Sequence, residues 1–195
     1  MPIRNHMFAL ISTGALALSG LTTSTAPVLA KPMREHTVMV GGAAMYPTRN
    51  IIENAVNSRD HTTLVAAVKA AGLVDTLSGP GPFTVFAPTN AAFAKLPAGT
   101  VDTLLQPANH DTLVKVLTYH VVPGRLTAAD LAAQIKAGGG TAQLTTVQGG
   151  TLTTRMMGTG IVLVDEKGGI AHVTQSNVMQ SNGVIHATDT VSMPN

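Results

Sequence analysis

The chain has 195 residues, with 12 Lys and Arg against 10 Asp and Glu, a net charge of +2, and no cysteine. Its basic residues are dispersed, whereas nucleic-acid binding needs a concentrated basic stripe, so we exclude a nucleic-acid partner. The lack of cysteine excludes disulfides and a thiol nucleophile, so stability has to come from packing. The length suffices for one domain with a substantial core.

Residues 1–30 have the pattern of a signal peptide. Arg4 supplies a positive charge, Met7 to Leu21 form an apolar run, and small residues lead to a cleavage position at Ala30. A membrane anchor is the alternative, but the run is shorter than the ~20 residues that a spanning helix needs. We therefore predict export with cleavage after Ala30, a secreted or periplasmic location, and no membrane span in the mature chain.

The mature chain is predicted to consist of an extended arm or linker at residues 31–48 and one domain at residues 49–195. The arm contains Gly, Met and Pro without a sustained period. Thr48 is a candidate cap for a short helix. Apolar residues at helical spacing between residues 64 and 71 predict a second helix that lies on a core.

Residues 83–87 then predict a buried strand that ends at Pro88 and turns directly into a helix capped by Thr89. Residues 119–122 form a β-prone run closed by Pro and Gly. Thr127-Ala-Ala-Asp130 has the spacing of a capping box, which predicts the start of a further helix.

After residue 140 the pattern changes to β. Hairpins are predicted within residues 143–157 and 161–174, followed by a turn at Asn182-Gly183, where both residues tolerate the positive φ of a type I′ turn. The early strand at Phe83 has to join this sheet, next to the last strand, to bury its two phenylalanines. The predicted fold class is α+β.

Three segments, in this order, resemble the fasciclin-type domain: Phe83-Thr-Val-Phe-Ala-Pro-Thr-Asn-Ala-Ala-Phe93, Tyr119-His120-Val-Val-Pro-Gly124 and Asn182-Gly-Val-Ile-His186-Ala-Thr-Asp189. The resemblance covers one domain copy, from about Asn50 to Pro194. It implies a twisted β-sandwich wrapped by several α-helices and a role in extracellular adhesion. The residues that it assigns to the structural signature are Phe83, Phe86, Thr89, Asn90, Phe93, Gly183, His186 and Asp189.

Tyr119 and His120 are the candidate binding residues, with Leu117 and Leu126 as apolar neighbours. On a strand, their side chains would point to opposite faces, and the resemblance implies cell-surface binding for this segment. The alternative is a buried histidine whose hydrogen bond is structural. For Asn90, we expect its amide to bond the backbone of the closing strand, with a ligand contact as the alternative.

Metal binding and catalysis find little support. His172, His186 and Asp189 could in principle share a metal, but no His-x-His or His-Glu-x-x-His motif occurs, so no metal is predicted. No Gly-x-Ser-x-Gly nucleophile motif occurs either. Asp165 and Glu166 are adjacent in a glycine turn, which is typical of solvated carboxylates. We predict no catalytic residue and no cofactor.

The methionines are expected mainly to fill the core, although flexible thioethers also suit a surface for an apolar ligand. The sequence thus predicts a secreted cell-surface or matrix adhesion module without catalytic activity, whose partner is a protein or a glycan. The alternative function is an extracellular carrier of a small apolar ligand such as a pigment or a lipid.

Overall fold

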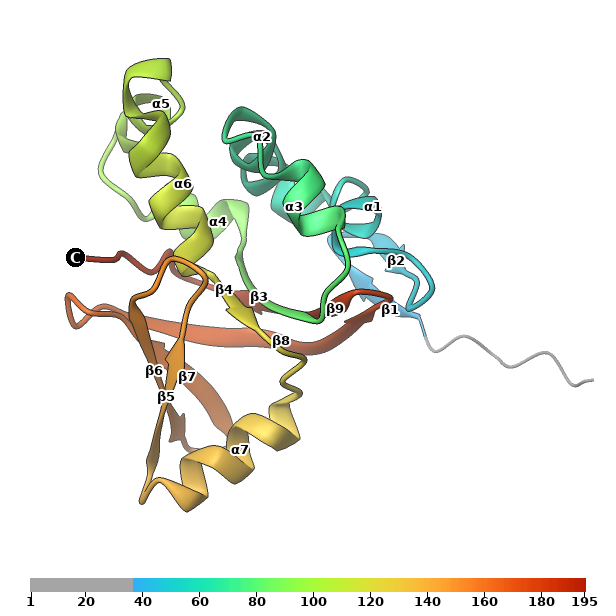
Figure 1. Ribbon diagram of the computed structural model, residues 1–195, viewed down its shortest axis with the longest axis vertical. Coiled ribbons are helices and arrows are strands. Elements are labelled where there is room, and N and C mark those ends of the chain that lie inside the picture. The colour runs from blue at the N-terminus through green and yellow to red at the C-terminus, as the bar shows by residue number, and fades with distance from the viewer. Residues whose placement is uncertain (1–36) are drawn as a thin grey trace, which may run out of the picture. The chain divides into compact units, whose positions relative to one another are not determined.

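The computed structural model describes residues 37–195. The predicted signal peptide and residues 31–36 of the predicted arm lie outside the described residues. A group of helices precedes and covers a sheet, and a last helix lies on the other side of it (Figure 1). The helices are α1 (Ile51–Ala55), α2 (Thr62–Ala70), α3 (Val74–Ser78), α4 (Asn90–Ala94), α5 (Thr100–Leu104), α6 (His110–Tyr119) and α7 (Ala128–Ala137), with 3-10 turns η1 (Arg59–His61) and η2 (Pro107–Asn109).

Most of the strands belong to one seven-stranded sheet in the order β4-β3-β9-β8-β7-β6-β5. The strands are β1 (Val38–Val40), β2 (Ala43–Met45), β3 (Phe83–Pro88), β4 (Val121–Pro123), β5 (Thr141–Thr145), β6 (Thr151–Met157), β7 (Gly160–Val164), β8 (Ile170–Gln180) and β9 (Gly183–Thr188). The α+β prediction is confirmed. The sheet folds back on itself into two layers. Its two edge strands, β4 and β5, come together where the Val147 amide, just after β5, donates to the Val121 carbonyl at 2.8 Å.

The early strand pairs with the last strand, as predicted. β3 and β9 run parallel, from Phe83 opposite Gly183 to Pro88 opposite Thr188, while the other neighbours in the sheet are antiparallel. Strands that are buried on both faces lack the polar alternation of a surface strand. All six residues of β9 and five of the six in β3 are buried, so this pair forms the centre of the domain.

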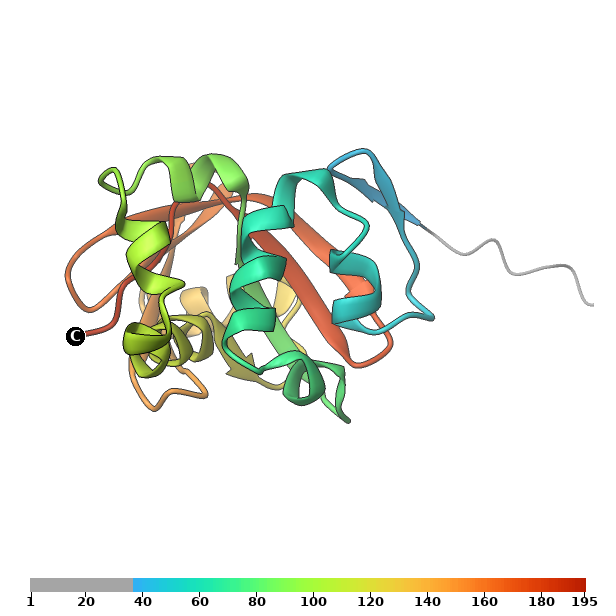
Figure 2. The same cartoon turned by 90° about the horizontal axis from the view of Figure 1, so that it is seen from above.

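Two apolar clusters lie on either side of the central pair. The first is formed by α1 to α6 and the adjacent face of β3 and β9; Figure 2 shows these helices lying over the strands. The second lies between α7 and β5, β6 and β7, and contains Phe86, Tyr119, Leu131, Leu152 and Leu163, each fully buried. In both clusters the helices contribute one apolar face, as the spacing of their apolar residues predicted.

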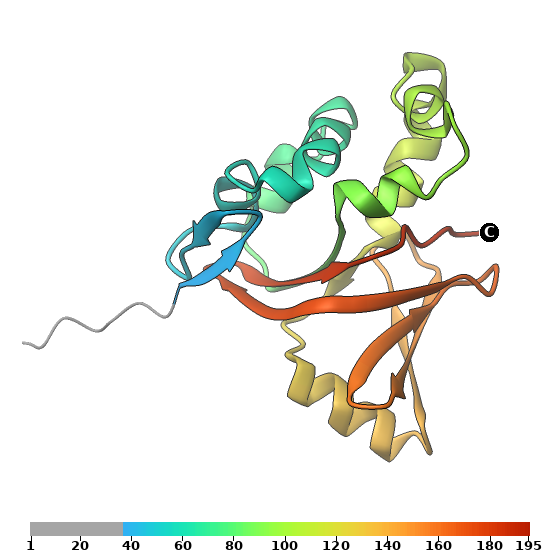
Figure 3. The same cartoon turned by 180° about the vertical axis from the view of Figure 1, so that it is seen from behind.

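The extended arm predicted for residues 31–48 is not observed over residues 37–48. β1 and β2 form a hairpin, with Val40 and Met45 buried in the first cluster. Gly41 and Gly42 make its two-residue turn with φ of 56° and 76°, the positive values that such a turn requires. This hairpin lies against the ends of β8 and β9 (Figure 3).

The turn predicted at Asn182-Gly183 has a different geometry. Gln180 pairs with Gly183, so the turn residues are Ser181 and Asn182. Asn177 is the one non-glycine residue with positive φ among residues 37–195, so the turn is not of type I′. Asn177 also lies within the irregular part of β8, which joins two strands that we expected to be separate.

The caps predicted for α4 and α7 are confirmed. The Thr89 hydroxyl accepts from the Ala92 amide, and Thr127 with Asp130 forms a capping box. At α1 the prediction of Thr48 is wrong, because Asn50 caps the helix in a capping box with Glu53. A shift of two residues at a helix end is within the usual uncertainty of a cap inferred from residue type.

Candidate functional site

Tyr119 and His120 end a helix; the strand predicted for them is wrong. Tyr119 is the last residue of α6 and His120 is its C-cap, and β4 begins only at Val121. Both side chains are buried, with exposed fractions of 0% and 3%. They therefore lie beneath the surface, and their contacts show what they hold in place.

His120 connects α6 to the C-terminal segment. Its Nδ1 lies 2.8 Å from the Val116 carbonyl oxygen, and its Nε2 accepts from the Ser192 amide at 3.0 Å. Nδ1 therefore carries the proton in this arrangement. Burial lowers the pKa of His120, while the Val116 carbonyl and Asp165 oppose this shift. The pKa stays below its ordinary value, so the ring is neutral near pH 7.

Tyr119 connects the same helix end to a loop. Its hydroxyl donates to the Thr151 carbonyl at 2.7 Å and accepts from the Glu166 amide at 3.2 Å. The neighbouring Asp165, expected to be solvated, is instead buried, and its carboxylate accepts from the Met193 amide at 2.8 Å. Tyr119 and His120 therefore act together to fix the 165–169 loop and the C-terminal segment.

His186 and Thr84 hold residues 124–126. The His186 Nε2 lies 2.8 Å from the Leu126 carbonyl, and its ring stacks on Phe86 with centroids 5.6 Å apart. The Thr84 hydroxyl donates to the Gly124 carbonyl at 2.7 Å and accepts from the Leu126 amide at 2.9 Å. The residue held between these anchors is Arg125, which is exposed.

Asn90 makes contacts other than those predicted. Its amide accepts from the Thr63 amide at 3.0 Å and donates to the Arg59 carbonyl at 2.8 Å, so it ties α4 to η1 and α2. The link to the closing strand comes instead from the Thr89 amide, which donates to the Thr188 carbonyl at 3.1 Å. The predicted bond of Asn90 to the closing strand is therefore wrong, and its hydrogen bonds lie within the helical layer.

The three residues considered for a metal do not assemble. Asp189 accepts from the backbone amide of His172 at 2.8 Å and pairs with Lys95 at 3.1 Å. His186 is fully buried and bonded to Leu126. Among residues 37–195, no group of three His, Cys, Asp or Glu side chains is arranged to hold a metal ion.

A groove of about 620 Å³ with both polar and apolar lining lies where Arg125 emerges. It is lined by Asn50, Glu53, Ser78, Gly79, Pro80, Gly81, Pro82, Arg125, Ser181 and Asn182. The Arg125 guanidinium donates to the carbonyls of Gln180 and Ser181 at 3.1 and 3.0 Å, which fixes the charge at the β8–β9 turn. The groove therefore offers a fixed cation, the exposed Glu53 carboxylate and the exposed rings of Pro80 and Pro82.

Asn182 holds both walls of the groove in place. Its side-chain oxygen accepts from the Ile51 amide at 3.0 Å, and its nitrogen donates to the carbonyls of Leu77 and Gly79 at 2.8 and 3.0 Å. A Cβ on Gly81 would lie 2.0 Å from the Asn182 carbonyl oxygen, so glycine is required there. A groove held in this way is largely pre-formed, which lowers the entropic cost of binding.

Sequence reasoning missed the groove. Its walls come from the Gly79-Pro-Gly-Pro82 segment, α1 and the residues around 125 and 181, which meet only after β3 pairs with β4 and β9. Pockets form preferentially where separate elements converge, and no local spacing records that convergence.

Comparison with known proteins places the fold in a family. A family model for the fasciclin domain matches residues 59–194. "Protein sll1483" of Synechocystis is 46% identical over 180 residues, covering 91% of this chain and 93% of that protein. "Immunogenic protein MPB70" of Mycobacterium bovis is 33% identical over 213 aligned positions, covering 100% of this chain and 99% of its own.

The structural comparison agrees. A solved fasciclin-domain pair from the insect cell adhesion molecule Fasciclin I has a TM-score of 0.59 and 18% sequence identity, covering 75% of this chain and 51% of that one. Over residues 37–195, no helix is both long and apolar enough to cross a bilayer. The matched motifs, the parallel β3–β9 pairing and these relatives lead to one conclusion: the chain belongs to the fasciclin-domain family.

Proposed function

We propose that this protein is an exported binding module, without catalytic activity, that attaches to a protein or a glycan on a cell surface or in a matrix through the groove around Arg125. The observation that carries the proposal is the fixed groove itself, with one cation and one carboxylate on walls held by Asn182. Interfaces that bind strongly place arginine among well-packed neighbours. The description of the insect relative as a cell adhesion molecule is consistent with this role.

Tyr119, His120, Leu117 and Leu126 enter the proposal as supports. Leu117 and Leu126 are buried and half-buried beside the two fully packed rings. Leu126 neighbours Arg125 and is held by Thr84 and His186. We propose that these side chains contribute to attachment indirectly, by holding in place the surface that meets the partner, because buried side chains make no direct contact with a partner.

The test measures attachment of the purified mature chain to the cell-envelope fraction of its source. Arg125→Ser removes the groove cation, and Lys136→Ser, on the exposed last turn of α7, is the matched control. We expect Arg125→Ser to weaken attachment about tenfold, as loss of a good interface arginine does, and Lys136→Ser to leave it unchanged. Equal attachment by parent and Arg125→Ser would refute the groove as the site.

Two treatments of the envelope separate the partner classes. Protease digestion abolishes attachment if the partner is a protein, and periodate oxidation abolishes it if the partner is a glycan. Failure of the parent protein to attach to any untreated envelope fraction would refute the binding function as a whole.

A further inference from the structure

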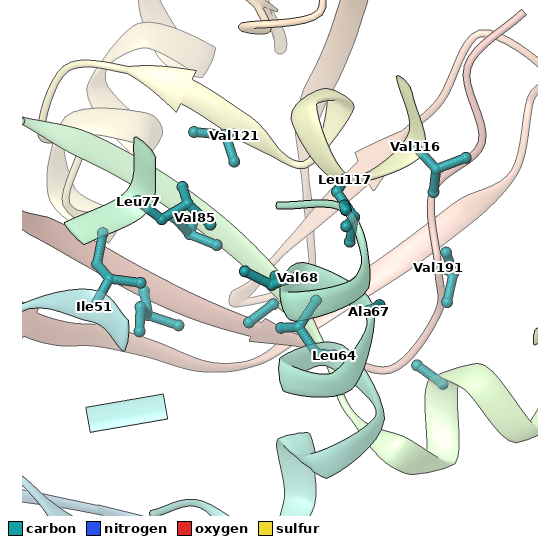
Figure 4. Close-up of a cluster of buried hydrophobic side chains, with 14 of the residues drawn as sticks. Ile51, Leu64, Ala67, Val68, Leu77, Val85, Val116, Leu117, Val121 and Val191 are labelled. Carbon is teal, nitrogen blue, oxygen red and sulfur yellow. The ribbon is translucent and has the colours of Figure 1, made fainter. Parts of the chain in front are cut away.

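A second candidate site lies inside the domain, and its lining shares no residue with the groove around Arg125. A cavity of about 50 Å³ lies between the helical layer and the central strands. Its lining is almost entirely apolar and includes Ile51, Leu64, Val68, Leu77 and Val85. Figure 4 shows these side chains converging from α1, α2, α3 and β3.

One polar atom in this lining lacks a partner. His61 lines the cavity and is 4% exposed, and its Nε2 has no hydrogen bond within the described residues. The Ala87 carbonyl is close enough to influence the ring, but no hydrogen bond of acceptable geometry forms. The second lining histidine, His120, has both nitrogens bonded. A buried polar atom without a partner is destabilising, so its position in a cavity points to a ligand atom.

The neighbour of His61 determines which kind of atom fits. The Ser58 hydroxyl lies 2.9 Å from Nδ1 and is itself buried. If the hydroxyl donates to Nδ1, the proton of the ring is on Nε2, and one group remains without a partner. If Nδ1 donates instead, both the hydroxyl proton and the Nε2 lone pair remain without one. The first arrangement leaves fewer buried groups unsatisfied, so Nε2–H is the free group and it needs an acceptor.

We infer that this cavity binds a small uncharged aliphatic molecule whose carbonyl or hydroxyl oxygen accepts a hydrogen bond from the Nε2–H of His61. A water molecule is a poor occupant, because buried water normally has two to four polar partners and the lining of this cavity is almost entirely apolar. Apolar lining with one fixed polar group is the usual composition of a small-molecule site.

Charge excludes a carboxylate as the group that binds His61. Burial lowers the pKa of His61, opposed by the Ala87 carbonyl and by Asp60, so the ring is neutral near pH 7. A carboxylate placed at His61 would then lack a counter-charge, because the cationic side chain in the lining, Lys69, is exposed to solvent, and burial of an unpaired charge is strongly unfavourable. Ketones, esters and alcohols carry the required oxygen without that cost.

Size limits the buried part of the ligand. An engineered cavity of about 150 Å³ accepts benzene, so a cavity of about 50 Å³ accepts roughly two heavy atoms on the same scale. Ile52, Val65 and Lys69 also line it and are only half-buried or exposed, so it reaches the surface between α1 and α2. An unbranched chain can therefore place its polar end at His61 and extend outward.

The experiment follows the Met45 methyl group, which lines the cavity and is 3% exposed. Mature protein with ¹³C-methyl methionine is titrated at pH 7.5 with 2-pentanone, pentane and pentanoate, and the Met45 signal is assigned with Met45→Leu. We expect 2-pentanone to shift the Met45 signal at lower concentration than pentane, and pentanoate to leave it unshifted.

Three variants control the result. His61→Phe keeps a ring but removes the donor, and we expect it to lose the preference for 2-pentanone over pentane, by about tenfold. Val68→Phe fills the cavity and should abolish both shifts, while His172→Phe, at an exposed position, should behave as the parent. Circular dichroism confirms that each variant is folded.

The inference is overturned if 2-pentanone leaves the Met45 signal of the parent unshifted, if pentanoate binds better than 2-pentanone, or if folded His61→Phe keeps the preference of the parent. If His61→Phe fails to fold, the same comparison is made with His61→Gln, whose amide retains a donor and should keep a preference for 2-pentanone; equal affinity for the two compounds would refute the donor role.

Discussion

Gly183 lies directly against Phe83 across the parallel β3–β9 pair: a Cβ on Gly183 would be 2.1 Å from the Phe83 carbonyl oxygen. The contact is with backbone, so no side-chain rotation relieves it. The first register pair of the central strands therefore requires glycine because of close approach, and a turn with positive φ is not the reason. Close approach of the two backbones is therefore the reason that the third sequence motif has glycine at this position.

Gly183→Ala is expected to lower the free energy of unfolding by about 1–3 kcal/mol, because two central strands have to separate locally. Urea denaturation of parent and variant measures the change. Gly160→Ala is the matched control, since its nearest new contact would be the Met157 carbonyl at an ordinary 3.7 Å. Equal losses in the two variants would contradict the role of close approach.

Asn182→Ala is expected to cost about 2–3 kcal/mol in the free energy of unfolding, because it leaves one backbone amide and two carbonyls without their partner. Since these bonds hold both walls of the groove, attachment should weaken as well. Ser181→Ala, at the exposed neighbouring turn position, controls for a change in the turn itself. Its effect on stability should be near zero, and a loss as large as that of Asn182→Ala would count against the bonds as the cause.

The local elements of the fold were predictable because their signals are local. Thr89 and the Thr127–Asp130 pair were identified as caps from residue type and spacing, and both make the predicted bonds. The β3–β9 pairing followed from the need to bury Phe83 and Phe86. The β1–β2 hairpin was missed although its Gly41-Gly42 turn is a recognised hairpin signal, because strands of three residues give too short a period to detect.

The site was less predictable, since its geometry depends on long-range contacts. A binding role for Tyr119 and His120 predicts exposed side chains, whereas both are buried at the end of a helix. The helix was not predicted there because α6 continues through a run whose residues also favour strands. Arg125 was not singled out, because its position depends on Thr84 and His186, which come from different strands. The expected core-filling role of the methionines is wrong for Met156 and Met157, which are 41% and 46% exposed.

The buried histidines predict a pH dependence. Burial is the largest influence on the pKa of His61, His120 and His186, and it lowers all three. The unfolded chain takes up protons near its ordinary histidine pKa of about 6.5, while the folded state resists them. Stability is therefore complete above that pH and falls as pH decreases below it, by up to about 1.4 kcal/mol per pH unit for each histidine.

His186 tests this directly, because its Nδ1 is buried without a hydrogen-bond partner among residues 37–195 and would have to accept the proton there. Urea denaturation at pH 7.5 and 5.5, a window above the carboxylate range, is expected to show a smaller pH-dependent loss in His186→Gln than in the parent. His172→Gln, at an exposed position, should keep the slope of the parent. An unchanged slope in folded His186→Gln would rule out His186 as a source of the pH dependence.

Tyr119→Phe separates a supporting role from a contact role. Loss of the hydroxyl removes the bonds to Thr151 and Glu166, so we expect a loss of about 1–2 kcal/mol in the free energy of unfolding. The Glu166 amide should exchange its hydrogen faster, and any weakening of attachment to the envelope should accompany that faster exchange. Tyr46→Phe is the matched control, because it keeps the ring that lies 4.7 Å from the Arg49 guanidinium. Weakened attachment by a Tyr119→Phe protein with unchanged Glu166 exchange would show that the hydroxyl contacts the partner itself.

The same substitution tests a pH dependence at alkaline pH. Burial raises the pKa of Tyr119 to about 12, so the tyrosine of the unfolded chain loses its proton at lower pH than that of the folded chain. The parent should therefore lose stability above pH 10, a loss that Tyr119→Phe is expected to reduce.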